Sequence, residues 1–454
     1  MKKSIHIKTT IPGPRSKQYT RDMVQYECPQ ITYHDKDFPV FWDTGVGMMV
    51  TDVDQNSYLD LTAAFGVANC GHSNPRIIKA ASNQFAKLSH GMGDVHPNYL
   101  KIELSAALRK IVPISRAQTI FSSSGAEAVE SALKTAMMVT DKPGIITFQS
   151  GYHGLTLGSL QATSWKTFRK PFQSALAPLS VSIPYPSAYH WKNHASDKEI
   201  IAITLENIRA IVQKKQAGKY PIGAIILEPI QGRGGARIPV KGFMSALARL
   251  SKELGILIIM DEIYSGFGRT GQWFACEEEN IRPDILCIGK GLANGFPISA
   301  CLASKSIMSA WGPSKGEAIH TSTFIGNPIG CAMGLATIHE IQANKLIPNA
   351  RKMGDYFLAR LLELKSKYPM LFGDVRGKGL MLGVELVTPK KSGFSATQLS
   401  IQIVKSALKQ GLIILASGEN SNILCITPPL VIQKKDIDLS IDVLDSCLAA
   451  LRIQ

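Results

Sequence analysis

Short apolar runs alternate with helix-like stretches through the middle of the chain. The runs are GIITF (144–148), IGAIIL (222–227), ILIIM (256–260), ILCI (285–288) and ISACLA (298–303). Continuous apolar runs of this length, bounded by glycine or polar residues, are typical of buried strands. The stretches between them have helical spacing. This alternation predicts βαβ units and a mainly parallel central sheet, so the expected fold class is α/β.

The pattern changes after Gly330. A long helical stretch at 331–343 and a second helix precede two short strand-like segments, MLGVEL (381–386) and NILCIT (422–427). Helices and strands are mixed here without the regular alternation of the preceding part. We therefore expect a smaller C-terminal α+β domain at 333–454.

The rest of the chain divides into two further parts. Residues 76–332 carry the alternating pattern and are expected to form a large domain. Residues 1–75 contain a hairpin-like segment, DVDQNSYLDL (52–61), and are expected to pack on the small domain. The segment PKKSG (389–393) indicates a surface loop.

The composition is that of an ordinary globular protein. Of 454 residues, 45% are hydrophobic and 19% are charged. The start, MKKSIHIKTT, has no apolar segment behind its lysines, and no uncharged apolar run reaches transmembrane length. We therefore expect a cytoplasmic protein without a membrane partner.

The chain is strongly basic, with a formal net charge of +15 and a pI near 9.4. Such a charge suits nucleic acid or an acidic substrate. The lysines and arginines are dispersed, however, without a long like-charge block or an RNA-binding signature. The positive charge is therefore interpreted as a general electrostatic property of the surface, and no nucleic-acid partner is expected. A nucleic-acid-binding protein on this fold stays open as the alternative from another functional class.

The cysteines are scattered and none forms a C-x-x-C pair. They are Cys28, Cys70, Cys276, Cys287, Cys301, Cys331, Cys425 and Cys447. This spacing argues against a zinc site and against a disulfide framework. We expect reduced core residues and no bound metal.

A helix start follows the residues FSSS at 121–124. Ser124 and Glu127 have the spacing of a capping box, and helical apolar spacing continues after them. Gly125 and Ala126 therefore expose free amide groups at a helix N-terminus, without bulk that would exclude an anion. The sequence predicts a phosphate site here. The alternative is a capped helix without a ligand, because any capped helix begins in this way.

Three predicted strands lead into charged residues. Glu228 follows IGAIIL, Asp261 follows ILIIM, and Lys290 follows ILCIG. Because the carboxyl ends of parallel strands meet at one edge of a sheet, the three side chains are expected to converge. A buried carboxylate must be paired with a cation or raise its pKa. The alternative for Asp261 is a simple helix N-cap.

Together these features meet the needs of pyridoxal 5'-phosphate. This cofactor requires a lysine that reaches its carbonyl carbon, an acid that holds its protonated ring nitrogen, and a site for its phosphate. Lys290 is the lysine in this interpretation, and it also acts as the general acid and base. Asp261 faces the ring nitrogen and keeps the ring protonated, and their ion pair offsets the burial of its charge.

The sequence resembles the class III aminotransferases of pyridoxal-phosphate-dependent fold type I, a family that includes 4-aminobutyrate, ornithine and acetylornithine aminotransferases. The matching motifs are SSGAEAVESALK, GYHG, EPIQG, DEIYSGFGRTG, GKGLANGFP and HTSTFIGNPIG. The resemblance covers nearly the whole chain, and the order of the motifs makes it specific. It implies a pyridoxal phosphate enzyme with a large, mainly parallel domain and a smaller C-terminal α+β domain.

The resemblance also implies residue roles. The expected cofactor-binding residues are Ser124, Gly125, Ala126, Tyr152, Glu228, Asp261, Ile263, Tyr264, Lys290 and Thr323. Tyr152 and Ile263 would cover the two faces of the ring, and His153 is expected to be a pocket wall. Tyr264 stands where other members carry a glutamine near the ring oxygen. Thr323 would reach the phosphate in the partner subunit, which implies a homodimer with shared sites.

The expected substrate-binding residues are Arg376, Arg233 and Phe65. Arg376, in DVRGKGLMLGVEL, matches a small-domain arginine that binds a carboxylate as a planar fork. Members that alternate between ω-amino donors and 2-oxoglutarate usually carry a glutamate where Arg233 stands. Two arginines facing one pocket would repel each other unless an anion lies between them, which favours a substrate with one carboxylate or with a second acidic group as well. Leu155 points the other way, because it replaces an anchoring arginine of many ω-amino acid enzymes. Alternatively, Arg233 turns to solvent or pairs with a nearby acid.

The expected activity moves an amino group from a carboxylate-bearing amine to a 2-oxo acid, with ω-amino acids such as 4-aminobutyrate favoured. An epimerase, racemase or aminomutase of the same family is the alternative, because these enzymes share the cofactor and the proton transfers. The reactions differ in where the proton returns, which motifs do not separate.

Overall fold

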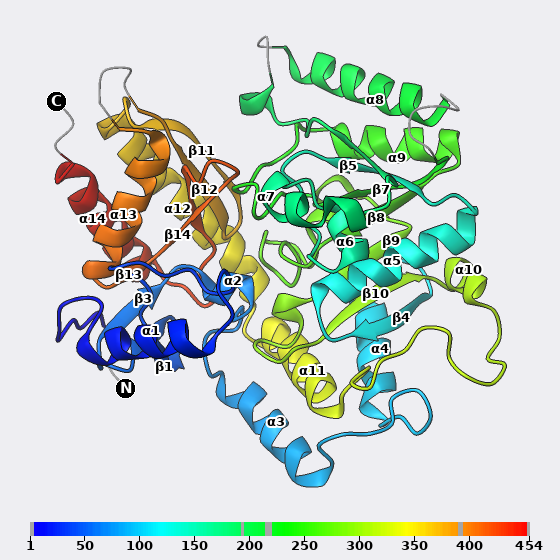
Figure 1. Ribbon diagram of the computed structural model, residues 1–454, viewed down its shortest axis with the longest axis horizontal. Helices are drawn as coiled ribbons and strands as arrows, with labels where there is room; N and C mark the ends of the chain where they lie inside the picture. The colour runs from blue at the N-terminus through cyan, green and yellow to red at the C-terminus, as the bar shows by residue number, and fades with distance from the viewer. Residues whose placement is uncertain (1–3, 192–194, 214–219, 389–393, 452–454) are drawn as a thin grey trace. The chain divides into compact units, whose positions relative to one another are not determined.

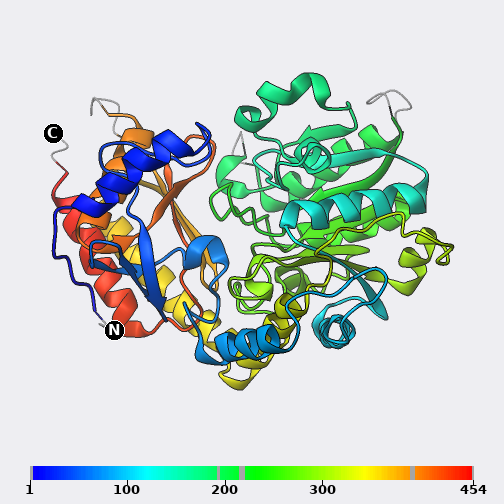
Figure 2. The same cartoon turned by 60° about the horizontal axis from the view of Figure 1, so that its bottom comes forward.

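The computed structural model describes residues 4–191, 195–213, 220–388 and 394–451. The chain divides into two compact units, a large unit of Pro75–Ile347 and a small unit of Met1–Asn74 with Pro348–Gln454. Figures 1 and 2 show the course of the chain through both. The domain boundaries expected from the sequence stay a prediction. The surface loop expected at 389–393 lies outside the described residues.

A seven-stranded sheet is the centre of the large unit in the described part of the chain. In spatial order its strands are β4 (Ala117–Ser122), β10 (Ser299–Ser304), β9 (Ile285–Ile288), β8 (Leu257–Asp261), β7 (Ile222–Leu227), β5 (Gly144–Phe148) and β6 (Ser180–Ile183). The strands from β9 to β6 pair in parallel. Every residue of β5, β7 and β9 is buried, as expected for parallel strands covered on both faces.

Strand β10 departs from the simple alternation, because it pairs antiparallel with both β9 and β4. Between β9 and β10 the chain makes only the short 3-10 turn η5 (Lys290–Leu292). A parallel pair needs a crossover of a dozen or more residues, usually a helix, so this shorter connection returns the chain antiparallel. The sheet is mainly parallel, as predicted, with this one strand reversed.

Helices surround the sheet of the large unit (Figure 1). The helices are α3 (Pro75–Lys87), α4 (Leu100–Ile111), α5 (Gly125–Thr140), α6 (Leu157–Ala162), α7 (Lys166–Arg169), α8 (Asp197–Gln213), α9 (Phe243–Leu254), α10 (Lys305–Met308) and α11 (Pro328–Ala343), with 3-10 turns η1 (Lys170–Ala175), η2 (Ala188–His190), η4 (Ala275–Glu279) and η6 (Ser309–Trp311). Helices α5 and α6 pack together, as do α8 and α9. Right-handed connections place α5 and α6 on one face of the sheet and α8 and α9 on the other.

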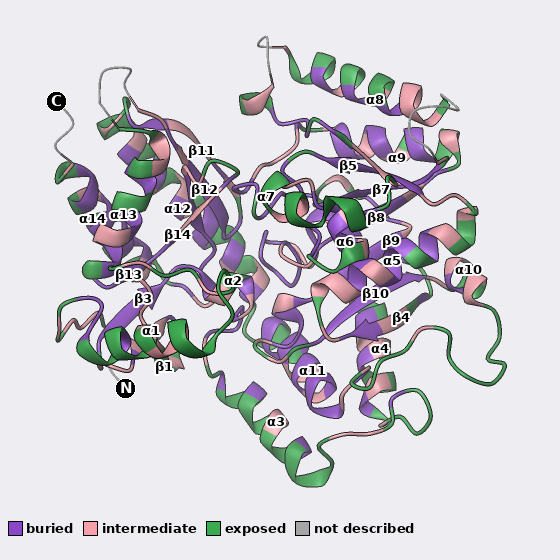
Figure 3. Ribbon diagram, in the orientation of Figure 1, coloured by how far each residue is buried: buried purple, intermediate pink, exposed green. Residues whose placement is uncertain are grey.

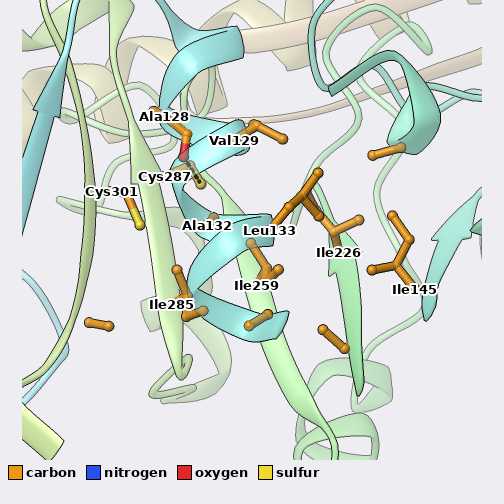
Figure 4. Packing of buried hydrophobic residues seen from close by; sticks show 14 of the residues in the cluster. Ala128, Val129, Ala132, Leu133, Ile145, Ile226, Ile259, Ile285, Cys287 and Cys301 are labelled. Atoms are coloured by element: carbon orange, nitrogen blue, oxygen red, sulfur yellow. Dashed lines mark hydrogen bonds between the residues drawn. The ribbon is translucent and has the colours of Figure 1, made fainter. Parts of the chain in front are cut away.

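The layer between α5 and the sheet is closely packed with small and branched side chains (Figure 4). It contains Ala128, Val129, Ala132 and Leu133 of α5 and Ile145, Ile226, Ile259, Ile285, Cys287 and Cys301 of the strands. Burial of each isoleucine contributes about 1.5–3 kcal/mol. Buried positions likewise follow the strands in Figure 3, while outer helix faces are exposed. This packing fixes the start of α5 relative to the strand ends.

The small unit contains two four-stranded sheets among its described residues. One has the order β1 (Trp42–Val46), β2 (Met49–Asp52), β3 (Ser57–Asp60), β13 (Leu412–Ile413), and the other β11 (Phe372–Lys378), β12 (Met381–Leu386), β15 (Ile423–Ile426), β14 (Leu415–Ser417). Its helices are α1 (Pro14–Tyr26), α2 (Ala63–Gly66), α12 (Leu346–Lys367), α13 (Ala396–Lys409) and α14 (Lys434–Ala449).

The N-terminal segment joins this unit by strand pairing. Strands β2 and β3 form the hairpin predicted at 52–61, and β3 pairs in parallel with β13 from the C-terminal part. The strands predicted at MLGVEL and NILCIT are also present, as β12 and β15. Helix α1 was not predicted.

Seven of the eight cysteines are buried, and Cys28 is exposed. The expectation that all eight are core residues is therefore wrong for Cys28. It follows the end of α1, where the chain turns across the surface beside Pro29.

Candidate active site

The three charged strand ends of the large unit meet at one edge of the sheet. Strands β7, β8 and β9 are parallel neighbours, and they place Glu228, Asp261 and Lys290 at or just beyond their carboxyl ends. The convergence expected from the sequence is confirmed. Edges of this kind are where open α/β sheets bind ligands.

Helix α5 begins at the same edge with the predicted capping box. The Ser124 side chain accepts a hydrogen bond from the Glu127 amide at 3.3 Å, and the Glu127 carboxylate accepts from the Ser124 amide. A Cβ on Gly125 would lie 2.9 Å from Cδ1 of Ile263, so only glycine fits beside that side chain without displacing it. The helix start therefore carries no side chain of its own at Gly125, and free amides at a helix start suit an anion.

Asp261 is buried and is bound by a histidine. Its Oδ2 lies 2.7 Å from Nδ1 of His153, and its Oδ1 accepts a hydrogen bond from the Ile263 amide at 3.1 Å. Burial opposes protonation of the imidazole, but the hydrogen bond and charge of Asp261 outweigh it and raise the pKa of His153. The expectation that His153 is a pocket wall is wrong, because its ring is fully buried as the partner of Asp261.

The other nitrogen of this histidine is unusual. His153 Nε2 is buried without a hydrogen-bond partner among the described residues. A Cβ on Gly151 would lie only 3.2 Å from it, which leaves no room for a side chain there. The sequence signal was present in GYHG, where the histidine directly follows Tyr152. This role could not be predicted from the motif alone, because the motif does not show that the histidine reaches Asp261 at the end of β8.

Glu228 connects two loops at the sheet edge. Its Oε1 accepts a hydrogen bond from the Tyr152 amide at 3.0 Å, and its Oε2 accepts from the Gly232 amide at 2.8 Å. Burial raises the pKa of Glu228 to about 7, and the charge of His153 and these amides only partly offset it. The contacts show a carboxyl group that fixes both loops, and its assignment to the cofactor stays a prediction.

The raised pKa of Glu228 predicts a pH-dependent stability. Between the ordinary pKa of 4.5 and about 7, the folded protein holds a proton that the unfolded chain has lost. The free energy of unfolding should therefore fall as pH rises through this range, by about 3 kcal/mol. In Glu228→Gln this contribution should be absent, so the free energy of unfolding should fall by about 3 kcal/mol less over the same pH range. Urea unfolding of both proteins at pH 4.5 and pH 7 measures it, and equal slopes would contradict the prediction.

Lys290 lies in a strained backbone position next to Tyr264. Its φ is +41°, a left-handed conformation that is rare for a residue other than glycine and that often marks functional positions. Its Nζ lies 3.7 Å from the centre of the Tyr264 ring, a cation–π distance. A Cβ on Gly232 would be 2.1 Å from Cδ1 of Tyr264, so this glycine makes room for the tyrosine.

Arg233 stacks on aromatic rings. Its guanidinium carbon lies 4.6 Å from the centre of the Tyr152 ring and 5.2 Å from that of Phe168. The two rings contact each other edge to face. The sequence alternatives for Arg233 were solvent or a nearby acid, and the aromatic contacts were not foreseen. Phe168 is thus a further residue of this region that the sequence analysis did not name. Its position close to Trp165, in a short aromatic segment, is the one signal that could have drawn attention to it.

Arg376 has carboxylate partners within the small unit. It lies on β11, is mostly buried, and forms ion pairs with Asp374 at 2.8 Å and with Glu385 at 2.9 Å. Two negative charges therefore already balance its positive charge. These two carboxylates offset the like-charge repulsion with Arg233 that was expected to favour an anionic substrate. The assignment of Arg376 to a substrate carboxylate stays a prediction.

The last two candidates, Thr323 and Phe65, are each exposed within their own unit. Thr323 lies in the loop 321–327 of the large unit, just before α11. Phe65 is 58% exposed in the small unit and has a φ of +63°, within the irregular turn that Thr62 caps. Their proposed roles, at a partner's phosphate and at the substrate, stay predictions.

The matched sequence family decides the class of protein. Residues 31–448 match the family Aminotransferase class-III. The chain belongs to this family. It is 35% identical over 460 residues to a 4-aminobutyrate aminotransferase of Mycobacterium bovis, which covers 99% of both chains. It is also 33% identical over 441 residues to an alanine/serine racemase of Pyrococcus horikoshii, covering 96% of this chain and 91% of the other.

Solved structures of class III aminotransferases have the same fold. An (S)-enantioselective omega-transaminase from Thermomicrobium roseum matches with a TM-score of 0.87 and 27% identity, covering 96% of this chain and 98% of the other. An aminotransferase of Bacillus anthracis also has a TM-score of 0.87 at 27% identity, covering 98% and 100%. The predictions of family, fold and enzyme class are confirmed.

Class III aminotransferases depend on pyridoxal phosphate and use an amino donor and a 2-oxo acid. Within the described residues, no cluster of His, Cys, Asp or Glu is arranged to hold a metal ion. None of the described helices combines the length and the apolar character of a membrane span.

Proposed function

We propose that this class III aminotransferase binds pyridoxal 5'-phosphate at the edge formed by β7, β8, β9 and the start of α5. There it moves an amino group from a carboxylate-bearing amine, with ω-amino acids favoured, to a 2-oxo acid. The observation that carries the proposal is Asp261, a buried carboxylate fixed by His153 at the end of β8, next to the strand that leads into Lys290.

The residues of the edge fit the cofactor. Asp261 is a buried carboxyl group. Among the described residues His153 contacts its Oδ2 and a backbone amide its Oδ1, an arrangement that suits a carboxylate facing a cationic ring nitrogen. Gly125 adds no side chain at the start of α5, where free backbone amides suit a phosphate. The Ile263 side chain lies between Gly125 and Gly289, next to Lys290, where it would contact one face of a planar ring.

Each residue would then have a defined task. Pyridoxal phosphate, when bound, supplies an electron sink that stabilises a carbanion at the substrate carbon. Asp261 would keep the proton on the ring nitrogen by its charge, and His153 would hold Asp261 in place. Lys290 would anchor the cofactor and move the proton to and from the substrate carbon. Ser124, Gly125 and Ala126 would bind the phosphate, and Tyr152 would cover the second ring face.

The preference for a carboxylate-bearing donor rests on Arg233. Its stacking on Tyr152 and Phe168 holds a planar cation beside Tyr152, a residue expected at the ring of the cofactor. A guanidinium held in this way can offer its N–H fork to a carboxylate. The family relative named 4-aminobutyrate aminotransferase supports the same class of donor. Because Arg376 is already balanced by two carboxylates, a second acidic group on the substrate is not part of the proposal.

Replacement of Arg233 by alanine tests this preference. For carboxylate-bearing donors kcat/KM should fall about 10- to 100-fold, the value of one lost charge-assisted hydrogen-bond contact. For amines without a carboxylate it should hardly change. The measurement is a donor screen with one 2-oxo acid acceptor, and Arg249→Ala, an exposed arginine on α9, is the control. Uncharged amines as the best donors of the wild type, with an unchanged ranking in Arg233→Ala, would refute the preference.

The similarity to an alanine/serine racemase supports the second candidate function. A racemase would use the same lysine and the same buried carboxylate, and would return the proton to the opposite face of the carbon. Transamination consumes a 2-oxo acid in proportion to the amine, whereas racemisation consumes none. Following a single enantiomer of alanine with and without a 2-oxo acid therefore separates the two.

A homodimer with shared sites is also part of the proposal. Five large apolar side chains of the large unit are each at least 56% exposed: Met92, Val95, Tyr99, Ile102 and Phe324. Their two segments are tied together, because the Thr321 hydroxyl donates a hydrogen bond to Asp94 at 2.9 Å. Exposed apolar residues that gather in this way favour a protein interface, and Thr323 lies among them. Sedimentation velocity tests the dimer.

A cytoplasmic location is proposed as well, and fractionation of cells tests it.

A further inference from the structure

A cavity of about 470 Å³, lined by residues of polar and charged types, lies near the edge of the large sheet. It is lined by Thr147 on β5, Ser180 and Ser182 on β6, and Ser164, Lys166, Arg169, Lys170 and Gln173 from the segment of α7 and η1. Ile145 of β5 packs against α5, and Thr147, two residues on, lies on that same sheet face. None of these eight residues is among the candidates for cofactor or substrate.

The lining has the chemistry of an anion site. Three of its side chains are cationic, four carry hydroxyl groups, and none of these described lining residues is acidic. Lys166 and Lys170 are exposed and have no ion-pair partner within the described part of the chain. Three cations around one cavity without an acidic lining residue favour an anion between them.

Arg169 gives this cavity a built wall. Its Nη1 donates hydrogen bonds to the carbonyl oxygens of Leu160, Gln161 and Thr163 at 2.8 to 3.0 Å. These contacts fix the guanidinium at the end of α6, so its charge is held at the cavity before any ligand arrives. Preorganised cations of this kind bind phosphate more tightly than mobile surface lysines, because less side-chain entropy is lost.

We propose that this cavity binds a small phosphorylated compound with a hydroxyl-bearing body, of the size of a sugar phosphate or a mononucleotide. The volume lies within the range of small-molecule sites, about 300–1,000 Å³, and is far larger than inorganic phosphate requires. Lys166, Arg169 and Lys170 bind the phosphate. The hydroxyl groups of Thr147, Ser164, Ser180 and Ser182, with the Gln173 amide, bind the polar body.

The cavity segment also contacts the loop that leads to Tyr152. The Ser164 amide donates a hydrogen bond to the Gly151 carbonyl at 3.0 Å, and the Trp165 indole donates to the Ser150 carbonyl at 3.1 Å. Between the two lining residues of α7, Phe168 has its ring against Tyr152. A ligand that orders this segment is therefore expected to protect residues 150–153 from hydrogen exchange as well as its own site.

The test is calorimetric titration of the holoenzyme, freed of excess cofactor, with ribose 5-phosphate and with AMP. Wild type should bind at least one of them, and Lys166→Gln/Lys170→Gln should weaken binding at least about 10-fold. Ser182→Asp, at an exposed position, should abolish binding because it places a carboxylate in the cavity. Lys198→Gln, an exposed lysine on α8, is the control and should bind as wild type does. Arg169 is not replaced, because its three hydrogen bonds hold the local fold.

Other probes and a localisation experiment complete the test. Ribose, adenosine and succinate should bind at least about 10-fold more weakly than the phosphorylated probes, since each lacks the phosphate. Hydrogen exchange should show protection at 164–173 and 180–183. The proposal is overturned if neither phosphorylated probe binds, if the lysine variant and Ser182→Asp bind as wild type does, if succinate binds equally well, or if protection appears at 124–126 instead.

Discussion

Replacement of Lys290 by alanine is expected to lower kcat for amino transfer by about 10⁴-fold, the upper end of what a general acid–base group contributes. The loss should be this large because, in the proposed function, this one side chain both anchors the cofactor and moves the proton. Alanine keeps a Cβ, so the replacement does not relieve the backbone strain at a φ of +41° and should not change the stability through it. The variant should therefore fold as the wild type does and fail in catalysis.

Two measurements check this role of Lys290. Turnover with an amino donor and a 2-oxo acid gives kcat, and circular dichroism confirms the fold. Borohydride reduction of the wild type followed by peptide mass spectrometry should find the pyridoxyl group on the peptide that contains Lys290. Lys305→Ala, at the start of α10, is the control and should keep full activity. A reduced adduct on another lysine, or none, would show that the assignment is wrong.

The strands of the large sheet could be predicted because burial leaves a direct trace in the sequence. GIITF, IGAIIL and ILCI coincide with β5, β7 and β9, in which every residue is buried. A parallel strand covered on both faces must be apolar throughout, so the run and the strand coincide. The capping box of α5 was equally local, since it involves side chains three residues apart.

Contacts between distant segments left no such trace. The hydrogen bond between His153 and Asp261 joins residues 108 positions apart, and nothing near either residue signals it. The ion pairs of Arg376 depend on the pairing of β11 with β12, which brings Glu385 beside it. The sequence identified the residue types at both places, but partner choice depends on how the strands and loops fold together. Of the proposed site, the strand ends were predictable, and the residues that hold them were not.

The buried pair of His153 and Asp261 gives the second large effect. Replacement of Asp261 by asparagine removes a charge but keeps the shape, so the fold should persist while kcat falls by about 10²- to 10³-fold, as for one lost electrostatic contact at a reaction centre. An asparagine cannot hold a proton on the ring nitrogen by charge. Cofactor affinity should fall with turnover, and equilibrium dialysis against pyridoxal phosphate measures it. Asp284→Asn, a partly buried acid before β9, is the matched control.

The pKa of His153 distinguishes an electrostatic role of Asp261 from a purely structural one. In the wild type, burial lowers the pKa of His153 but the hydrogen bond and charge of Asp261 raise it further, so the net shift is upward. In Asp261→Asn the burial remains and the opposing charge is gone, so the pKa should fall below that of the wild type. The imidazole is then neutral at pH values where the wild type is protonated, which NMR titration of the ring measures. Wild-type turnover together with an unchanged His153 pKa in Asp261→Asn would show that the carboxylate only caps the strand end, since a cap functions with an amide as well as with a charge.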